Sequence, residues 1–387
     1  MKRLAIITTH PVQYSAPMFA LLTERRKVQV KVFYTWGESV LQDKYDPGFD
    51  KTISWDIPLL EGYDYCFVKN KATDPGSHHF KGIDNPSLLR EIEEWKADAV
   101  LIYGWSFKSH LKAMRYFHGR IPVFFRGDST ILHKENNFQS LIRKYFLRWV
   151  YCHVDKVFYV GTNNKWYFKQ HGLKEKDLLF VPHAVDNERF VDEVGIFQLQ
   201  ADEWRTKSGI NPDDFTIVYA GKLEPIKNLK WLIETIKGMD PIVSITLILV
   251  GNGPLEKGLK QMVQNDKRFL FIDFQNQQKM PVVYRLGQVF ILCSHSETWG
   301  LSINEAMASG RAILINENCG CATDLVQNDV NGYVYSSSDK NSLIKYIKQL
   351  AADRKLVENM GKESEKIISG WNFTEVCKAI ETAIESI

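Results

Sequence analysis

Residues 289–310 read V-F-I-L-C-S-H-S-E-T-W-G-L-S-I-N-E-A-M-A-S-G, and they decide the fold that we expect around them. Residues 289–293 form an apolar run with the length and residue types of a buried strand. A helical pattern begins at Ser302, so the stretch predicts a strand, a short loop containing Gly300, and a helix. The first amides of a helix lack intrahelical partners, and together with the helix dipole they favour a bound anion.

Two acidic residues, Glu297 in the loop and Glu305 in the first helical turn, lie beside this expected anion site. Each has an ordinary alternative explanation. Ser302-Ile303-Asn304-Glu305 fits a capping box, and Glu297 fits a solvated loop carboxylate. A sugar nucleotide suits the combination, because its diphosphate binds amides and cations while its hydroxyl groups bind carboxylate acceptors.

Length and composition limit the class of protein. A chain of 387 residues exceeds what one hydrophobic core usually holds, so we expect two domains. Hydrophobic residues make up 44% and charged residues 25%, as in ordinary globular proteins. The net charge of +3 is too small to indicate nucleic-acid binding, and we expect no nucleic-acid partner.

The cysteines and the apolar runs bear on the cellular compartment. The six cysteines include no C-x-x-C pair, which argues against a disulfide framework or a structural zinc site. The N-terminus shows no cleavable signal pattern, and the apolar runs fall short of the roughly 20 residues that span a bilayer. We therefore expect a cytoplasmic protein.

Apolar, strand-like runs alternate with helical patterns along most of the chain, which predicts an α/β protein with parallel sheets. A first series has expected strands at 4–8, 28–34, 99–103, 123–125 and 157–160, with helices at 17–25, 88–96, 108–117 and 138–152. A second series has expected strands at 216–220, 245–250, 269–273, 289–293 and 312–315, with helices at 229–237, 255–264, 302–309 and 342–351. A turn-rich segment at 181–186 separates the two series, and an amphipathic helix at 371–387 ends the chain.

Several well-known phosphate and metal motifs are missing from the sequence. Thr9-His10-Pro11-Val12-Gln13 follows the first predicted strand without a glycine, so the G-x-G-x-x-G fingerprint is absent there. Gly251-Asn252-Gly253 follows another strand, but by itself it is a weak signal. No P-loop and no Asp-x-Asp triplet occurs, and His295-Ser296-Glu297 lacks the P-C-x-x-C partner of a zinc deaminase. We expect neither a metal nor another cofactor.

Positive charge is expected near Glu297. Gly221-Lys222-Leu223-Glu224-Pro225-Ile226-Lys227 follows the first strand of the second series, at the carboxyl end of the sheet where ligands bind in this architecture. Most loop lysines are simply solvated. Here Lys222 and Lys227 share a sheet edge with Glu297, so we expect them to neutralise a leaving diphosphate.

The ordered motifs between residues 182 and 332 resemble those of retaining family-4 glycosyltransferases. The resemblance rests on Glu297 and Glu305 as an E-x7-E motif containing Trp299-Gly300-Leu301, Gly221-Lys222-Leu223 with Lys227, Val181-Pro182-His183-Ala184-Val185-Asp186 with Phe190, Gly251-Asn252-Gly253-Pro254, Gly320-Cys321-Ala322-Thr323-Asp324, and Asn331-Gly332. It implies the GT-B fold, in which two Rossmann-like domains face each other across a cleft. Residues 1–182 would form the acceptor domain and 183–370 the donor domain, with the helix at 371–387 packing back on the first domain.

The resemblance also implies roles for individual residues. Glu305 would accept hydrogen bonds from the ribose hydroxyls, and Glu297 would contact the donor sugar. The amides of Gly300 and Leu301 would join Lys222 and Lys227 around the diphosphate. The expected catalytic residues are Glu297, Lys222, Lys227 and Asp128, and the expected donor-binding residues are Glu305, Trp299, Gly300, Leu301, Gly253, His10 and Gln13.

Two places depart from the family pattern, and a third residue aligns with it only loosely. Lys222 replaces an arginine, so a forked, bidentate grip on phosphate becomes a point charge. His10-Pro11-Val12-Gln13 replaces a glycine pair of the first domain. Asp128 lies near a family position that contacts the sugar, and the equal alternative is a turn residue after a strand.

The resemblance implies a retaining glycosyltransferase that moves a sugar from a nucleotide-diphosphate sugar to an acceptor. We expect a cell-envelope glycan or a lipid-linked saccharide as the acceptor, because a helix at a membrane surface would suit one. The alternatives are a sugar-nucleotide epimerase or phosphorylase, and a non-catalytic partner subunit of the same fold. The expected helix at 138–152 combines basic and aromatic residues, which fits either contact with the inner face of a membrane or an ordinary aromatic core stripe.

Overall fold

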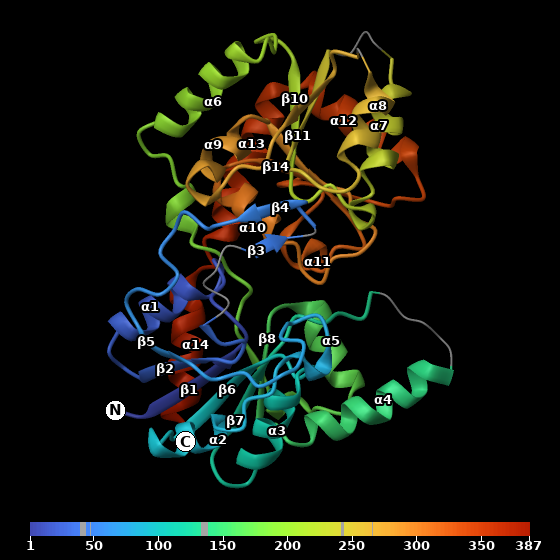
Figure 1. The fold of residues 1–387 in the computed structure, drawn as a ribbon. Coiled ribbons are helices and arrows are strands. Elements are labelled where there is room, and N and C mark those ends of the chain that lie inside the picture. The colour runs from blue at the N-terminus through green and yellow to red at the C-terminus, as the bar shows by residue number, and fades with distance from the viewer. Residues whose placement is uncertain (39–43, 47, 133–137, 241–243, 265) are drawn as a thin grey trace. The chain divides into compact units, whose positions relative to one another are not determined.

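The computed structural model describes residues 1–38, 44–46, 48–132, 138–240, 244–264 and 266–387 (Figure 1). The chain divides into two compact units. Unit 1 consists of Met1–Asp43, Ile57–His183 and Phe373–Ile387, and unit 2 consists of Lys44–Asp56 and Ala184–Asn372. The longer segment of unit 2 begins at Ala184, next to the expected boundary at 183. Residues 44–56, which we expected in the first domain, group with unit 2 instead.

The described residues of unit 1 form a seven-stranded sheet with the order β5-β2-β1-β6-β7-β8-β9. All neighbouring strands are parallel. The strands are β1 (Arg3–Thr8), β2 (Gln29–Tyr34), β5 (Asp64–Phe67), β6 (Ala99–Tyr103), β7 (Val123–Arg126), β8 (Lys156–Tyr159) and β9 (Leu178–Phe180). Consecutive residues of β1, from Leu4 to Ile7, are fully buried, so both faces of this inner strand are covered.

Helices cover the sheet of unit 1. They are α1 (Ala16–Glu24), α2 (Leu88–Glu94), α3 (Lys108–Phe117), α4 (Phe138–Tyr151), α5 (Thr162–Gln170) and α14 (Phe373–Glu385), with short 3-10 turns η2 (Phe80–Gly82) and η3 (Glu175–Asp177). The C-terminal helix α14 packs against α1 near the start of the chain (Figure 1). Two hydrogen bonds join Arg25, at the end of α1, to the buried carboxylate of Glu381, at 2.6 and 2.9 Å.

The described residues of unit 2 form a six-stranded parallel sheet with the order β12-β11-β10-β13-β14-β15, and a separate antiparallel hairpin of β3 (Lys44–Asp46) and β4 (Lys51–Ile53). The sheet strands are β10 (Phe215–Ala220), β11 (Ile245–Val250), β12 (Phe269–Ile272), β13 (Val289–Leu292), β14 (Ala312–Asn316) and β15 (Gly332–Tyr335). The helices are α6 (Ile196–Lys207), α7 (Leu229–Lys237), α8 (Glu256–Val263), α9 (Met280–Arg285), α10 (Leu301–Ala308), α11 (Ala322–Leu325), α12 (Lys340–Ala352) and α13 (Arg354–Ile368), with 3-10 turns η4 (Asn187–Phe190), η5 (Pro225–Lys227) and η6 (Gln277–Lys279).

The expected alternation of parallel strands and helices is confirmed in both units. The elements that we did not predict include the short strands β5, β9 and β15 and the β3–β4 hairpin. We also missed the longer helices α5, α6 and α13, of which α13 has 15 residues and buries one face. In β9 only three residues, Leu-Leu-Phe, carry the apolar signal, which is too short a run to distinguish from a loop.

The Arg25–Glu381 pair predicts a measurable contribution of α14 to stability. Replacing Arg25 with Met should lower the free energy of unfolding by about 3 kcal/mol, because it leaves a buried carboxylate without its main partner. Urea denaturation followed by far-UV circular dichroism measures this. Arg90→Met is the matched control, since Arg90 pairs with Glu94 on an exposed helix face and should have little effect. Equal losses from the two variants would contradict the assigned role of the pair.

Candidate functional site

The candidate site of unit 2 lies at a point where the order of the strands reverses. Strand β10 pairs in parallel with β11 on one side and with β13 on the other. The connections after β10 and β13 therefore leave the same edge of the sheet in opposite directions. Ligands of open α/β sheets bind in the crevice at such a position.

Lys227 and Glu297 meet at this edge of the sheet, as their sequence positions predicted. The backbone amide of His295 donates to the carbonyl of Ile226 at 2.8 Å, which ties the loop after β13 to the loop after β10. The Lys227 ammonium forms an ion pair with Glu297, and the Ser294 hydroxyl donates to the same carboxylate oxygen at 2.7 Å. Both charged side chains are a little under one-fifth exposed, so the pair is shielded but reachable.

Gly300 sets the start of helix α10. Its φ of +104° lies in the left-handed region, and an added Cβ would lie 2.8 Å from Cδ2 of Leu292. Only glycine meets both conditions without strain. Helix α10 begins at Leu301, and the first amides of a helix have no intrahelical acceptor. The loop therefore places a helix start, of the kind that can bind an anion, three residues after Glu297 at the same sheet edge.

The capping-box alternative for Glu305 is wrong. Helix α10 begins at Leu301, so Ser302 lies inside the helix and cannot be its N-cap residue. The N-cap residue is Gly300, and no side-chain capping hydrogen bond forms there. The carboxylate of Glu305 instead accepts a 2.5 Å hydrogen bond from the hydroxyl of Tyr284 in α9. Glu305 is only 3% exposed, and burial raises the pKa of its carboxyl group to about 7. The Tyr284 hydrogen bond and the charge of Arg189 lower this pKa, but they do not outweigh burial.

The side chain of Trp299 is buried in the core of unit 2 and anchors this loop. The indole is 3% exposed, and its Nε1 donates to Oδ1 of Asn304 at 2.9 Å. Its ring packs on that of Trp371, with the centroids 5.3 Å apart. The side chain thus anchors the loop in the core of unit 2, so any donor contact from this position must come from the main chain.

Lys222 has a partner that no sequence motif indicated. Its ammonium donates to Oδ1 of Asp46 at 2.9 Å and lies 5.1 Å from the ring centroid of Phe49. Both partners belong to the segment 44–56, which packs on unit 2 through further contacts such as Asn276 Nδ2 with the carbonyl of Ser54, at 2.7 Å. The ammonium group of Lys222, which we expected to bind phosphate, is therefore paired with the Asp46 carboxylate.

Gly253 allows the backbones of neighbouring loops to approach closely at the same edge of the sheet. An added Cβ at Gly253 would lie 2.8 Å from backbone atoms of both Gly48 and Leu223. Gly251 shows the same close approach, since a Cβ there would lie 2.0 Å from the carbonyl oxygen of Gly221. The Gly-Asn-Gly turn is therefore required for packing against the lysine loop, a role that its sequence spacing alone did not reveal.

The three expected residues of unit 1 follow strands at the carboxyl edge of its own sheet. His10 follows β1, its Nδ1 lies 2.8 Å from the Thr9 hydroxyl, and its ring contacts Trp36 edge-on. Gln13 lies in the same connection and is partly buried. Asp128 follows β7 and acts electrostatically on Arg126 and His183.

Arg126 also fixes the end of the segment Ile57–His183 of unit 1. It donates to the carbonyls of Val181 and Pro182 at 2.9 and 3.0 Å. Burial and the Arg126 charge lower the pKa of His183 to about 4, so this residue is neutral near pH 7. Asp128 is thus next to a structural anchor of the interdomain segment.

A comparison with protein families matches part of unit 2. Residues 200–367 match the family described as "Glycosyl transferases group 1". The matched residues make up less than half of the chain, and we call them the group 1 region. All the expected site residues of unit 2, from Lys222 to Glu305, lie inside the group 1 region.

Curated relatives of the group 1 region share modest identity with the chain. N-acetyl-alpha-D-glucosaminyl L-malate synthase of Bacillus anthracis is 25% identical over 229 residues, which cover 52% of this chain and 59% of the relative. UDP-Gal:alpha-D-GlcNAc-diphosphoundecaprenol alpha-1,3-galactosyltransferase of Escherichia coli is 27% identical over 203 residues, half of each chain. The chain thus spans between half and three-fifths of the length of these relatives.

A solved structure supports the fold over the whole chain. Anabaena Alr3699/HepE in complex with UDP is similar with a TM-score of 0.75, covering 100% of both chains at 17% identity. The expected GT-B class, with two Rossmann-like domains, is thereby confirmed. Within the described residues, no helix is both long and apolar enough to cross a bilayer.

The pKa of Glu305 predicts how stability depends on pH. A raised carboxyl pKa means that the folded state binds the proton more tightly than the unfolded state, whose pKa is near the ordinary 4.5. The cost of ionising buried Glu305 is therefore absent below pH 4.5, grows as the pH rises, and is complete above about 7. Glu305→Gln should remove up to about 3 kcal/mol of this cost at pH 8.

Denaturant titrations of both proteins at pH 4, 6 and 8 measure this difference. We expect the stability of Glu305→Gln relative to the parent chain to increase between pH 4 and pH 8. Tyr284→Phe is a useful companion, because it removes a hydrogen bond to Glu305 and should raise the carboxyl pKa further. A stability difference that does not vary with pH would show that Glu305 ionises normally.

Proposed function

We propose that the chain is a retaining glycosyltransferase that moves a sugar from a nucleotide-diphosphate sugar to a cell-envelope glycan or a lipid-linked saccharide. The observation that carries this proposal is the shielded Lys227–Glu297 pair beside the start of α10, inside the group 1 region. The UDP complex of Alr3699/HepE supports a nucleotide donor. The diphosphoundecaprenol acceptor named for the Escherichia coli relative supports a lipid-linked acceptor.

The diphosphate would bind where positive charge converges. The ammonium group of Lys227 has three N–H donors, so it can contact phosphate oxygens while it keeps Glu297. The free amides at the start of α10 supply further donors. Lys222 adds a second cation once Asp46 gives up its bond or shares it. These groups stabilise the charge that develops on the leaving diphosphate, which is the main contribution we assign to catalysis.

The two acidic residues would bind different parts of the donor. Glu297 is held by Lys227 and Ser294 through one oxygen, Oε1, so its other oxygen can accept from a hydroxyl of the transferred sugar. Glu305 would accept hydrogen bonds from ribose hydroxyls, since it is buried in the first turns of α10 and fixed by Tyr284. Hydroxyl donors favour the ionised carboxyl group, so donor binding should lower the pKa of Glu305.

Retention follows from a displacement on the same face of the sugar. The bond between the anomeric carbon and the phosphate oxygen breaks while the acceptor oxygen bonds to that carbon. The acceptor proton passes to the departing phosphate oxygen, so the protein need not supply a base. Under this proposal Lys222, Lys227 and the helix amides carry the charge stabilisation, and no metal is required.

A donor panel tests the proposal against its alternatives. Thermal shifts with UDP-, GDP- and ADP-sugars identify the nucleotide, and the selected donor is then incubated with and without lipid-linked acceptors in the presence of EDTA. A transferase releases nucleoside diphosphate and forms an α-linked product from an α-linked donor, which proton coupling constants establish. Conversion of the donor without acceptor would indicate an epimerase, and binding without chemistry would indicate a non-catalytic partner.

Lys227→Ala should lower turnover about 100-fold or more, because the leaving diphosphate loses a pre-positioned cation. Nucleoside diphosphate release under saturating donor measures the effect, and urea denaturation checks the fold. Lys230→Ala is the matched control, since that lysine is exposed on the following helix α7. Turnover that falls no further than stability does would count against the role of Lys227.

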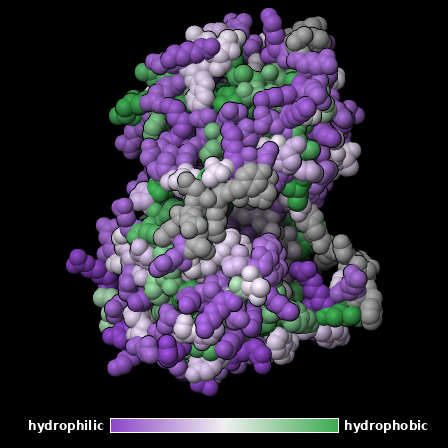
Figure 2. Space-filling view, viewed as in Figure 1, coloured by the Kyte–Doolittle hydropathy of each residue, from purple (hydrophilic) through white to green (hydrophobic). Residues whose placement is uncertain are grey.

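We also propose that helix α4 contacts a membrane surface. One face of α4 is buried through Leu147, Val150 and Tyr151. The aromatic core-stripe alternative fails for the other face, which exposes Leu141, Ile142, Tyr145, Phe146 and Trp149. Figure 2 shows hydrophobic residues on the surface at this helix. Because Arg143, Lys144 and Arg148 are exposed on the same helix, the surface suits anionic lipid, and it would place the chain at the cytoplasmic face.

The membrane proposal predicts flotation with liposomes that contain anionic lipid. Ile142 and Tyr145 are 56% and 62% exposed, so replacing both with Ser should remove most of the bound fraction without disturbing the core. Leu199→Ser is the matched control, because Leu199 is 61% exposed on α6 in unit 2. Equal flotation of the Ile142/Tyr145 variant and the parent chain would contradict a membrane role for α4.

A further inference from the structure

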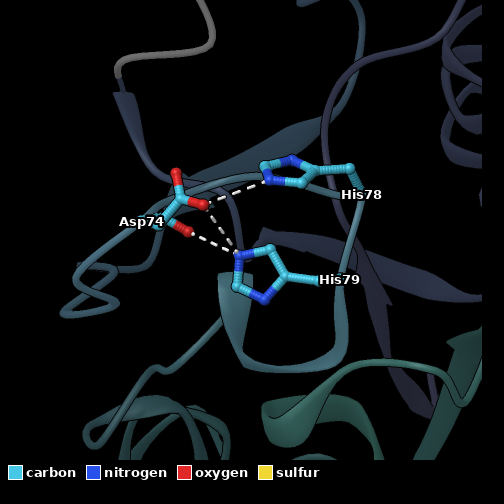
Figure 3. A group of neighbouring side chains, drawn as sticks. All are labelled: Asp74, His78 and His79. Carbon is cyan, nitrogen blue, oxygen red and sulfur yellow. Dashed lines mark hydrogen bonds and ion pairs between the residues drawn. The ribbon is translucent and has the colours of Figure 1, made fainter.

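Three side chains that can bind a metal converge in a loop of unit 1, away from the residues discussed above. Asp74, His78 and His79 lie between β5 and η2, after the carboxyl end of an edge strand (Figure 3). Oδ2 of Asp74 lies 3.2 Å from Nε2 of His78 and 3.3 Å from Nε2 of His79. Figure 3 shows both imidazole rings directed at the same carboxylate.

The backbone of this loop is fixed without help from the histidines. Asn70 donates to the carbonyl of Gly82 at 2.9 Å and accepts from the amides of Ala72 and Asp84, both at 3.0 Å. The amide of Gly76 donates to the carbonyl of Gly82 at 3.0 Å. The loop therefore closes on itself at its base, and its side chains are presented from a frame that is already formed.

Two glycines make room for the cluster. An added Cβ at Gly82 would lie 2.1 Å from the carbonyl oxygen of Gly76, so the two strands of the loop approach as closely as glycine permits. An added Cβ at Gly76 would lie 2.4 Å from Nδ1 of His78. In this orientation the ring of His78 lies directly against the backbone of Gly76. The ring of His79 packs edge-on against it, with centroids 4.6 Å apart.

The spacing of the ligand atoms fits a small transition-metal ion. A tetrahedral zinc site with bonds of about 2.0–2.1 Å has ligand atoms about 3.3 Å from one another. The two distances from the Asp74 oxygen to the imidazole nitrogens already have this value. All three ligand atoms lie within 4.8 Å of one another, so rotation of the exposed rings could bring the two imidazole nitrogens to the same spacing.

We propose that Asp74, His78 and His79 form a binding site for a divalent transition metal, of which Zn²⁺ is the best candidate. Two imidazoles and one carboxylate match Zn²⁺, Co²⁺, Ni²⁺ and Cu²⁺, whereas Mg²⁺ and Ca²⁺ prefer oxygen ligands. Each neutral imidazole would bind through the Nε2 lone pair and carry its proton on Nδ1. His79 would then give up the 3.0 Å bond from its Nε2 to the main-chain oxygen of Asp74.

The exposure of the cluster defines the kind of site. The side chains of Asp74 and His78 are 72% and 65% exposed, so water would occupy the remaining coordination position and the ion would exchange with solvent. The site is therefore open and reversible, unlike a closed structural zinc site. A bound ion would link residue 74 to residues 78 and 79 and restrict the outer part of the loop. The inference does not depend on the proposed transferase activity.

Equilibrium dialysis of the chain, without an affinity tag, against ZnCl₂ tests the proposal. We expect the cluster to bind one Zn²⁺ per chain. The double variant His78→Ala/His79→Ala should bind this ion at least about tenfold more weakly, because it lacks two of the three ligands. Co²⁺ substitution should give the visible d–d absorption of a site with nitrogen and oxygen ligands, and this band should be absent in the double variant. Circular dichroism verifies that the variant is folded.

His118→Ala is the control, since this histidine lies after α3 beside His153 and outside the cluster. It should leave the cluster-dependent Zn²⁺ and the Co²⁺ band unchanged. The proposal is overturned if the parent chain binds no Zn²⁺ at up to about 100 µM, or if the double variant binds Zn²⁺ as tightly as the parent does.

Discussion

The parallel pairing of β10 with β13 is the constraint on which the candidate site depends. It brings two loops that are about 70 residues apart to one edge of a sheet, one carrying Lys227 and the other Glu297. The bond between the His295 amide and the Ile226 carbonyl fixes their spacing. Gly300 then allows the chain to enter α10 at once, so that free amides follow directly after the acidic loop. Strand order, two loops and one left-handed glycine thus assemble a cation, a carboxylate and a helix end.

The charged side chains of the candidate site in unit 2 are paired with each other or buried, an arrangement that suits a polar ligand. Lys227 and Glu297 neutralise each other, and Lys222 is neutralised by Asp46. Glu305 is buried with a raised carboxyl pKa, which is costly for folding and therefore calls for a reason beyond packing. A nucleotide sugar would supply phosphate for the lysines and hydroxyl donors for the carboxylates. The same groups that now pair with each other would each gain a partner from the ligand.

The sequence was sufficient for the parts of the site that depend on local pattern and strand order. Lys227 and Glu297 were predicted to share an edge because each follows a strongly apolar strand, and they do. The capping box at Ser302 failed because Gly300 starts the helix earlier than the S-x-x-E pattern suggested. Asp46 could not have been predicted, since no local signal shows that residues 44–56 pack on unit 2. The Tyr284–Glu305 bond likewise arises from the packing of α9 against α10, which periodicity does not encode.

The most direct test of this account is a crystal structure of the chain grown with the nucleotide sugar that binds most tightly. The account predicts the diphosphate against Lys227 and the first amides of α10, the ribose hydroxyls on Glu305, and the sugar within hydrogen-bond distance of Glu297. A nucleotide bound elsewhere on the chain, with the Lys227–Glu297 pair and the start of α10 left without contact to phosphate, would contradict it.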